Sequence, residues 1–399
     1  MTDPTPNPPP ENHQPPAEEI PPVRSLRELI DRVTGRNLDA LHPAEDAGIA
    51  DVVPFPFLAL VGQDEMKLSL LLATINPHMG GVLLIGPRGT GKTTAVRSLP
   101  ELLPQTLRSL CYYGCLPEDI EAGGLEAVCP DCAVKYGQGE PLATLDQVRL
   151  VELPLNARLE DVVGGLDERA AIQGHVRLRR GILAQADRNL LYVDEVNLLS
   201  DEVVDAILDA AAQGNYHVRR GPISATYRAR FVLVGSMNPE EGKLRPQIMD
   251  RFGLRVVVRG LQGAPERLEA YRRALAYLNH PRQISAEFAA NTGLAQEDIQ
   301  AARDLLPQVE IPDDVANMGL ALIERLKIDS LRAEITLLEA ARAYAIADAR
   351  LKVIPADLHA VAPMALRLRR SPFMDDYFTQ LDFEEREFST ILQETIPAD

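Results

Sequence analysis

The most constraining feature of the sequence is a glycine-rich segment, 86–93, between an apolar run and a helix-like segment. It reads Gly-Pro-Arg-Gly-Thr-Gly-Lys-Thr and fits the pattern G-x-x-x-x-G-K-[ST]. Residues 81–85 before it predict a buried strand, and residues 93–103 after it predict a helix. Glycines let backbone N–H groups turn toward a phosphate, and the N-terminus of the next helix adds partial positive charge. The segment therefore predicts a phosphate site inside a strand–turn–helix unit.

The residues expected to contact the phosphates are Gly86, Pro87, Arg88, Gly89, Thr90, Gly91, Lys92, Thr93 and Thr94. Among them, Lys92 is expected to reach the β and γ phosphates of a nucleoside triphosphate, and Thr93 to offer its hydroxyl to a magnesium ion. The alternative is a purely structural turn, which the strand and helix on either side disfavour.

A second apolar run, 190–193, ends in two adjacent carboxylates. Asp194 can hold the magnesium ion, and Glu195 is placed to orient or deprotonate an attacking water. Two acids after a strand can also simply cap a helix. Next to a phosphate loop, the pair predicts hydrolysis of the nucleotide as well as binding.

A third polar residue, Asn238, follows the run 231–234. We expect this strand to lie between the other two, so that the Asn238 amide can hydrogen-bond the water or the γ-phosphate. Because Asn before Pro commonly forms turns, this assignment depends on the two preceding motifs.

Further apolar runs and their spacing predict an α/β fold, a parallel P-loop sheet with crossover helices, followed by a smaller all-helical domain. The strands are expected at 81–85, 190–193, 231–234 and 256–258, and strands disappear between 265 and 370. The expected division is a disordered Pro-rich acidic tail (1–23), a linker (24–54) with a short helix at 25–41, a nucleotide-binding domain (55–260) with an insertion (105–148), a helical lid domain (261–372) and an acidic tail (373–399).

Composition excludes several classes of function. The chain has 399 residues and a formal charge of −17, which disfavours a surface made to bind nucleic acid. It has no run of 18 apolar residues, so no membrane span is expected. Residues 1–23 lack the basic and apolar regions of a secretory signal, so we expect a cytoplasmic protein.

The four cysteines form two close pairs, Cys111-x3-Cys115 and Cys129-x2-Cys132. In a reduced compartment, two such pairs suit tetrahedral zinc, because each pair can hold one edge of the metal. Free or redox-active thiols and an iron–sulfur cluster remain the alternatives.

Several ordered blocks together resemble the ATPase subunit I of magnesium chelatase, a branch of the AAA+ ATPases. The blocks are 55–57, 61–67, 86–93, 151–156, 192–199 and 238–253, within a match that spans roughly residues 55–370. The resemblance also implies an inserted helical segment at 157–182 and a hairpin at 216–230.

The resemblance implies a ring, commonly a hexamer, that hydrolyses ATP with Mg2+. In it, Arg251 matches the arginine finger that enters the neighbouring protomer's ATP site, and Arg332 matches the second sensor, which contacts the γ-phosphate from the lid. Ala333 stands where the family usually has Gly.

The implied activity is ATP-driven insertion of Mg2+ into protoporphyrin IX in (bacterio)chlorophyll synthesis. The implied partners are the chelatase's D and H subunits, of which D is a related ring protein and H binds the porphyrin. A cobalt-chelatase ATPase and a MoxR-type AAA+ chaperone are the alternatives; the block 238–253 favours a chelatase over the chaperone.

Overall fold

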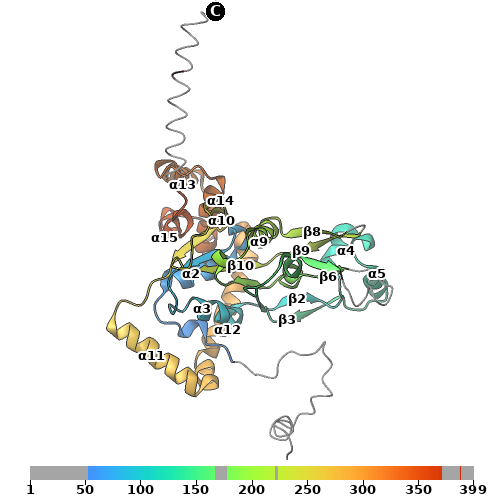
Figure 1. Cartoon of the computed structure of the whole chain (residues 1–399), viewed down its shortest axis with the longest axis horizontal. Coiled ribbons are helices and arrows are strands. Elements are labelled where there is room, and N and C mark those ends of the chain that lie inside the picture. The colour runs from blue at the N-terminus through green and yellow to red at the C-terminus, as the bar shows by residue number, and fades with distance from the viewer. Residues whose placement is uncertain (1–52, 167–177, 221–222, 371–386, 388–399) are drawn as a thin grey trace, which may run out of the picture. The chain divides into compact units, whose positions relative to one another are not determined.

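The centre of the protein is a five-stranded parallel sheet (Figure 1). The computed structural model describes residues 53–166, 178–220, 223–370 and 387. The strand order is β11-β1-β10-β7-β4. Their bounds are β1 Val82–Ile85, β4 Leu150–Glu152, β7 Leu190–Val193, β10 Val232–Met237 and β11 Leu254–Val257. Since all pairs are parallel, the carboxyl ends of these strands meet at one edge of the sheet, where open α/β sheets bind ligands.

Alternate side chains of the strands enter two different hydrophobic clusters. In β1, Val82 and Leu84 belong to one cluster, whereas Leu83 and Ile85 belong to the other. The inner strands are buried along their whole length, which explains their continuous apolar runs. Both faces of the sheet are therefore covered.

Helices α2 and α3 cover the first face together with the C-terminal helices, whereas α6, α8, α9, α10 and the β8–β9 hairpin cover the second. The bounds are α2 Asp64–Ile75, α3 Lys92–Ser98, α6 Leu159–Val163, α8 Ile182–Gln185, α9 Asp201–Gln213 and α10 Pro246–Arg251. Helix α9 begins with two acids in its first turn and ends at Gly214, which has φ 69°. These are the usual signals for a helix start and stop.

The C-terminal region is helical, and all of its helices except the first contribute buried residues to the cluster on the sheet's first face. Its helices are α11 Ala264–Asn279, α12 Pro281–Leu305, α13 Asp313–Arg325, α14 Leu331–Ala347 and α15 Pro355–Leu366. Helix α14 is central, because its buried alanines, such as Ala340 and Ala341, allow close approach of α2 and α15. The 3-10 turns are η2 Phe57–Ala59, η3 Pro77–Met79, η4 Leu99–Leu102, η5 Leu125–Ala127, η6 Val196–Leu198 and η7 Leu306–Gln308.

Three antiparallel strand pairs extend from the sheet core toward α4 and α5 (Figure 1). The strands are β2 Thr106–Ser109 with β3 Ala143–Asp146, β5 Gly164–Leu166 with β6 Leu178–Arg180, and β8 Asn215–Arg220 with β9 Ile223–Arg228. Helices α4 Pro117–Gly123 and α5 Pro130–Gly137 lie between β2 and β3 in the chain. Insertion 105–148 is thus a strand pair closed by two short helices.

The predicted fold class is confirmed, including the position of the Asn238 strand between the strands of the phosphate loop and of Asp194. The expected hairpin at 216–230 is also present as β8–β9. Segment 93–103 differs from the prediction, because the α-helix ends at Ser98 and continues as the 3-10 turn η4. Pro100 explains the change, since it has no N–H to continue the α-helical bonding.

Two other segments differ from what the sequence suggested or are described only in part. Strand β4 was not expected, because its three residues between Arg149 and Leu153 are too few to show a clear period. In segment 157–182, the described residues (157–166 and 178–182) contain α6, the β5–β6 pair and the first residue of α8, and the remainder of the expected helical insertion lies outside the described residues. The predicted helix at 25–41, the tail 1–23 and all of 373–399 except Glu387 lie outside the described residues. Across the described ranges, no helix is both long and apolar enough to cross a membrane.

Candidate functional site

The phosphate loop connects the end of β1 to the first turn of α3. Gly91 is the residue before the helix and has φ 85°, a conformation that glycine adopts without strain. Lys92 is nearly buried, and its Nζ donates to the carbonyl oxygens of Gly86 at 2.7 Å and Pro87 at 2.8 Å. The ammonium group therefore lies at the base of the loop, within reach of a phosphate held by the loop amides.

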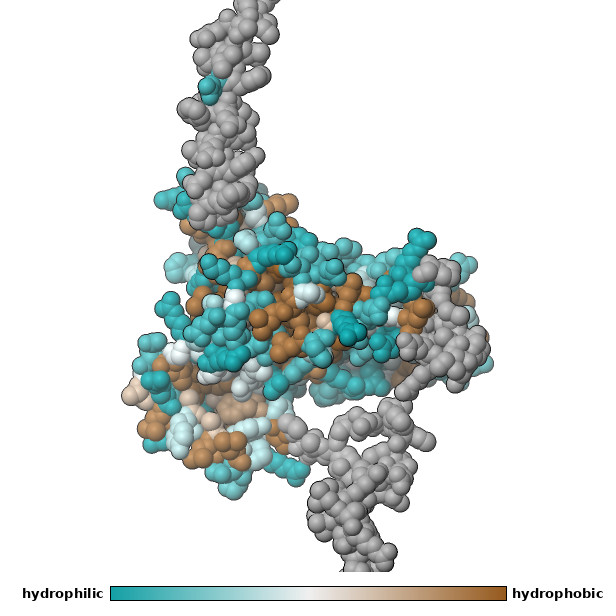
Figure 2. Space-filling model, viewed as in Figure 1, coloured by the Kyte–Doolittle hydropathy of each residue, from teal (hydrophilic) through white to brown (hydrophobic). Residues whose placement is uncertain are grey.

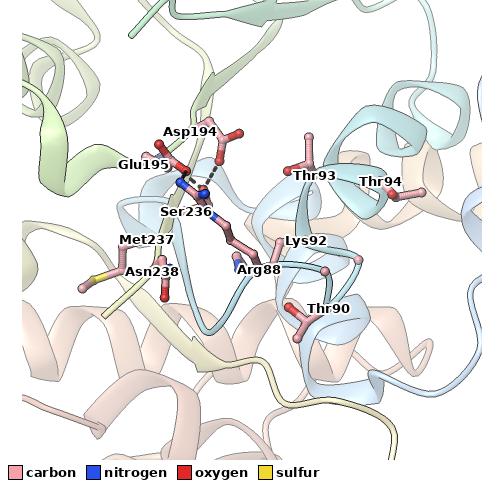
Figure 3. A pocket seen from close by; sticks show the side chains of 12 residues that line it. Arg88, Thr90, Lys92, Thr93, Thr94, Asp194, Glu195, Ser236, Met237 and Asn238 are labelled. Atoms are coloured by element: carbon pink, nitrogen blue, oxygen red, sulfur yellow. Dashed lines mark hydrogen bonds and ion pairs between the residues drawn. The ribbon is translucent and has the colours of Figure 1, made fainter. Parts of the chain in front are cut away.

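The carboxylate of Asp194 is held at the mouth of the same pocket by two hydroxyl groups. Tyr192 Oη donates to Asp194 Oδ1 at 2.8 Å and lies 3.2 Å from Thr93 Oγ1. Ser236 Oγ also donates to Asp194 Oδ1 (Figure 3). The Tyr192 hydroxyl thus lies between the side chains of Thr93 and Asp194. Hard oxygen donors of this kind suit Mg2+, so these residues fit the ion that a nucleotide brings.

Glu195 occupies an unusual backbone conformation directly after β7. Its φ of 49° and ψ of 51° are left-handed, and its N–H donates to Ser236 Oγ at 3.2 Å. The exposed Arg88 side chain extends across the pocket to Glu195 (Figure 3), with 3.2 Å between Arg88 Nη2 and Glu195 Oε1. Arg88 also pairs with Glu241. A left-handed non-glycine residue at a pocket is a strained position that surrounding contacts must maintain.

Asn238 lies at the end of β10 and is 4% exposed. Its Oδ1 accepts a hydrogen bond from the N–H of Glu240 at 3.3 Å. The side chain therefore forms the turn that an Asn-Pro pair suggests and also lines the pocket. Because the turn uses the carbonyl oxygen, the amide N–H groups are the part that can donate toward a ligand.

Burial lowers the pKa of Lys92, while the carboxylates of Asp194, Glu241 and Glu195 act in the opposite direction. Burial also raises the pKa of Tyr192, which keeps its hydroxyl protonated as a donor to Asp194. The pocket thus pairs three carboxylates with Lys92 and Arg88. A triphosphate entering it meets fixed negative charge that these two cations must offset.

The two predicted arginines lie outside the lining of this pocket. Arg251, at the end of α10, pairs with Asp209 at 2.8 Å and Asp205 at 3.3 Å, both on α9. Arg332, at the start of α14, is 4.0 Å from Asp250, the residue before Arg251. Arg332 is therefore not among the residues that line this pocket within one chain, and its contact with the γ-phosphate stays a prediction. Its helix, α14, packs against α2.

Asp250 connects the lid helices to the helix that bears Arg251. Its carboxylate accepts from Arg369 Nη1 at 2.7 Å, Arg255 Nη2 at 3.3 Å and Ser330 Oγ at 3.2 Å. Arg369 and Arg255 are almost fully buried.

The pocket itself is lined by Arg88, Gly89, Thr90, Gly91, Lys92, Thr93, Thr94, Asp194, Glu195, Ser236, Met237 and Asn238.

Four supporting residues were missed in the sequence. Tyr192 and Ser236 were visible only as members of strands, and Glu241 as part of the block after Asn238. Gln63 joins Thr90 to Arg259, with its Nε2 2.6 Å from the Arg259 carbonyl oxygen. Their one available signal was a polar side chain inside or just beyond an apolar run.

Ser236 offers a test of this network. We expect Ser236→Ala to lower the ATPase kcat about tenfold or more, because it removes a hydrogen bond to a carboxylate worth about 1.5–3 kcal/mol and releases the Glu195 N–H. The control is Ser69→Ala, which removes another fully buried hydroxyl, one that bonds only within helix α2. Equal loss in both variants would show a general packing effect and contradict the assignment.

The four cysteines come together at one place in insertion 105–148. Their Sγ atoms all lie within 4.8 Å of one another, and all four cysteines are free thiols. Burial opposes ionisation of Cys111, but hydrogen bonds from the Ser109 hydroxyl and the Cys115 N–H outweigh it and lower its pKa to about 6. Burial raises the pKa of Cys115 to about 11.

Two family models match the chain. Residues 165–249 match the family described as magnesium chelatase, subunit ChlI, and residues 321–386 match the AAA lid domain. A structural relative described as an ATPase from Cytophaga hutchinsonii has a TM-score of 0.51 at 18% identity and covers 78% of this chain and 83% of its own. That likeness shows the fold.

Two relatives match most of the chain in sequence. The magnesium-chelatase 38 kDa subunit of Acidiphilium rubrum is 44% identical over 323 residues, which cover 80% of this chain and 92% of that protein. The magnesium-chelatase subunit ChlI homolog of Methanocaldococcus jannaschii is 42% identical, with 80% and 87% covered. With this identity over nearly the full length of its relatives, and with the phosphate loop and lid in an AAA+ fold, the chain belongs to the magnesium-chelatase subunit I family of AAA+ ATPases.

Proposed function

We propose that this chain is the ATP-hydrolysing motor subunit of a magnesium chelatase, which drives insertion of Mg2+ into protoporphyrin IX in (bacterio)chlorophyll synthesis. The observation that carries the proposal is the pocket at the ends of three adjacent strands, where Lys92, Thr93, Asp194, Glu195 and Asn238 meet. Residues 55–260 would bind the nucleotide, and residues 261–372 would form the lid.

In this pocket, the loop amides and Lys92 bind the phosphates of ATP, and Thr93 and Asp194 hold the accompanying Mg2+. When bound there, the ion would supply positive charge to offset that of the phosphates. Asn238 positions a water, and Glu195 accepts its proton as the water oxygen bonds to the γ-phosphorus and the bond to ADP breaks. For Glu195 to accept this proton, its ion pair with Arg88 must open, since the guanidinium occupies the carboxylate oxygen that would face the water.

We also propose a ring of identical chains, with a hexamer as the expected size. Helix α11 supports it, because Leu268, Tyr271, Leu275 and Leu278 form an exposed apolar stripe along one side. Figure 2 shows apolar side chains exposed at the lower left, where Figure 1 places α11. Arg251 and Arg332, both outside their own chain's pocket, would act at the ATP site of the next protomer.

The proposed partners are the D and H subunits of the same enzyme, with protoporphyrin IX held by H. The expected compartment is the cytoplasm. The partner assignments come from the family resemblance, and a reconstituted reaction tests them together.

The test is a chelation assay with the purified chain, the D and H subunits, protoporphyrin IX and ATP. We expect Mg-protoporphyrin to form only when all three proteins and ATP are present, as measured by its fluorescence. A matched assay supplies Co2+ and a corrin substrate instead. Turnover by D and H without this chain, or a preference for cobalt, would contradict the proposal.

A further inference from the structure

The cysteine cluster lies in a module with almost no hydrophobic core. The buried residues of insertion 105–148 that form their own cluster are Cys115, Cys132 and Leu142, with partly buried side chains such as Ile120 and Val128 around them. A core of this size cannot offset the entropy of ordering such a segment, and small modules of this kind need a covalent or metal link. The structure nevertheless gives the module two short helices and a strand pair.

The cluster has the dimensions of a single metal ion. Four thiolates around tetrahedral zinc, each about 2.3 Å from the ion, lie about 3.8 Å from one another. All four Sγ atoms here are within 4.8 Å of one another, so a small inward movement of each completes that geometry. An iron–sulfur cluster distributes its thiolates over several iron atoms and needs a wider cage.

The backbone around the thiols is arranged to stabilise negative charge on sulfur. The Cys115 N–H donates to Cys111 Sγ at 3.2 Å, and the Cys129 N–H donates to Cys115 Sγ at 3.3 Å. Gly114, with φ 79°, turns the chain between the first two thiols. Such N–H···S bonds are the outer contacts that orient metal ligands.

Two arginines lie next to the first cysteine pair. Arg180 Nη1 donates to the Tyr112 carbonyl oxygen at 3.2 Å, and Arg228 Nη2 donates to the Gly114 carbonyl oxygen. A divalent ion with four thiolates carries a net charge of −2, which these guanidinium groups would partly balance. Arg180 is the last residue of β6 and Arg228 the last residue of β9.

The same contacts attach the module to the rest of the protein. Tyr112 Oη donates to the Leu178 carbonyl oxygen of β6 at 2.9 Å, and Arg228 and Arg188 pair with Asp119 and Glu118 at the start of α4. Glu118 and Asp119 follow the first pair by only a few residues, so the position of the thiols determines where these anchors lie.

We propose that Cys111, Cys115, Cys129 and Cys132 bind one zinc ion, which holds insertion 105–148 against strands β6 and β9. Binding releases the thiol protons to solvent and leaves four zinc–sulfur bonds without any change in oxidation state. The ion keeps insertion 105–148 folded beside the β8–β9 hairpin. The second strand of that hairpin leads into β10 and Asn238. This site is separate from the ATP pocket, so it stands or fails independently of the proposed function.

The first test is metal analysis of the full chain, purified without a metal-affinity tag and without chelators. We expect about one zinc per chain in the wild type and close to none in Cys132→Ser. Asp131→Asn, an exposed change between the second pair, is the matched control and should keep the zinc. Iron in place of zinc, no metal, or a mass that shows two disulfides would overturn the proposal.

A second measurement uses the wild-type chain, because Cys132→Ser can also lose the metal by misfolding. Removing the metal with a chelator should speed amide hydrogen exchange in 105–148 and β8–β9 but not in β1 and β7, and adding zinc should reverse the change. Replacing zinc with cobalt should give the visible absorption of tetrahedral cobalt thiolate. Exchange that is the same with and without metal would contradict the structural role.

Discussion

Lys92→Ala should reduce ATP hydrolysis at least about a hundredfold and abolish ATP-dependent chelation. Lys92 and Arg88 are the cations among the residues that line the pocket, and Arg88 is 73% exposed and paired with Glu195 and Glu241. Without Lys92, the phosphates meet the carboxylates of Asp194, Glu195 and Glu241 with little compensation. Loss of one positioned donor to a reacting anion typically costs about 10²–10³ in rate.

The measurement is steady-state phosphate release, with nucleotide binding followed separately by a fluorescent ATP analogue. Lys135→Ala is the control, because it removes an exposed lysine of α5, outside the pocket lining. Circular dichroism shows whether the nearly buried Lys92 position tolerates alanine. A folded Lys92→Ala protein that hydrolyses ATP normally would refute the assignment of the pocket.

Arg251→Ala should lower kcat about a thousandfold in a ring while leaving ATP binding largely unchanged. The physical reason is that a guanidinium from the neighbouring protomer stabilises charge that builds up only as the phosphoryl group transfers. In the chain's own structure, Arg251 pairs with Asp205 and Asp209 and lies outside the pocket lining. We therefore propose that Arg251 acts between chains.

Mixing two inactive proteins distinguishes this role from a structural one. A ring that contains both Lys92→Ala and Arg251→Ala chains has some boundaries where an intact pocket meets an intact Arg251, so partial ATPase activity should return. Arg245→Ala removes a similar arginine–aspartate pair between α10 and α9 and should retain activity. If the mixture stays inactive while each variant forms rings, Arg251 is not a finger acting in trans.

Much of the fold and the centre of the site could be predicted because they depend on local patterns. Buried parallel strands appear in the sequence as apolar runs. A polar residue in the segment that follows each run lies at the shared edge of the sheet. These patterns predict that Lys92, Asp194 and Asn238 lie near one another. Their separate chemical roles remain predictions.

Other parts of the site depend on residues far apart in the chain. The bond from Ser236 to Asp194 requires a particular register between β10 and β7, where Gly235 lies opposite Val193. The pairing of Arg88 with Glu195 and Glu241 depends on how a long side chain crosses the pocket. Sequence spacing carries no information on either arrangement.

By itself, the sequence determined the phosphate loop, the α/β sheet, the helical C-terminal region and the family, because each is a repeated local pattern or an ordered set of motifs. Only the tertiary structure decided that Arg332 lies beside Asp250, outside its own chain's pocket, and that four cysteines from two separate pairs converge within 4.8 Å. These outcomes depend on how helices pack on the sheet and how an insertion closes on itself, which is set by burial and side-chain shape across long sequence separations.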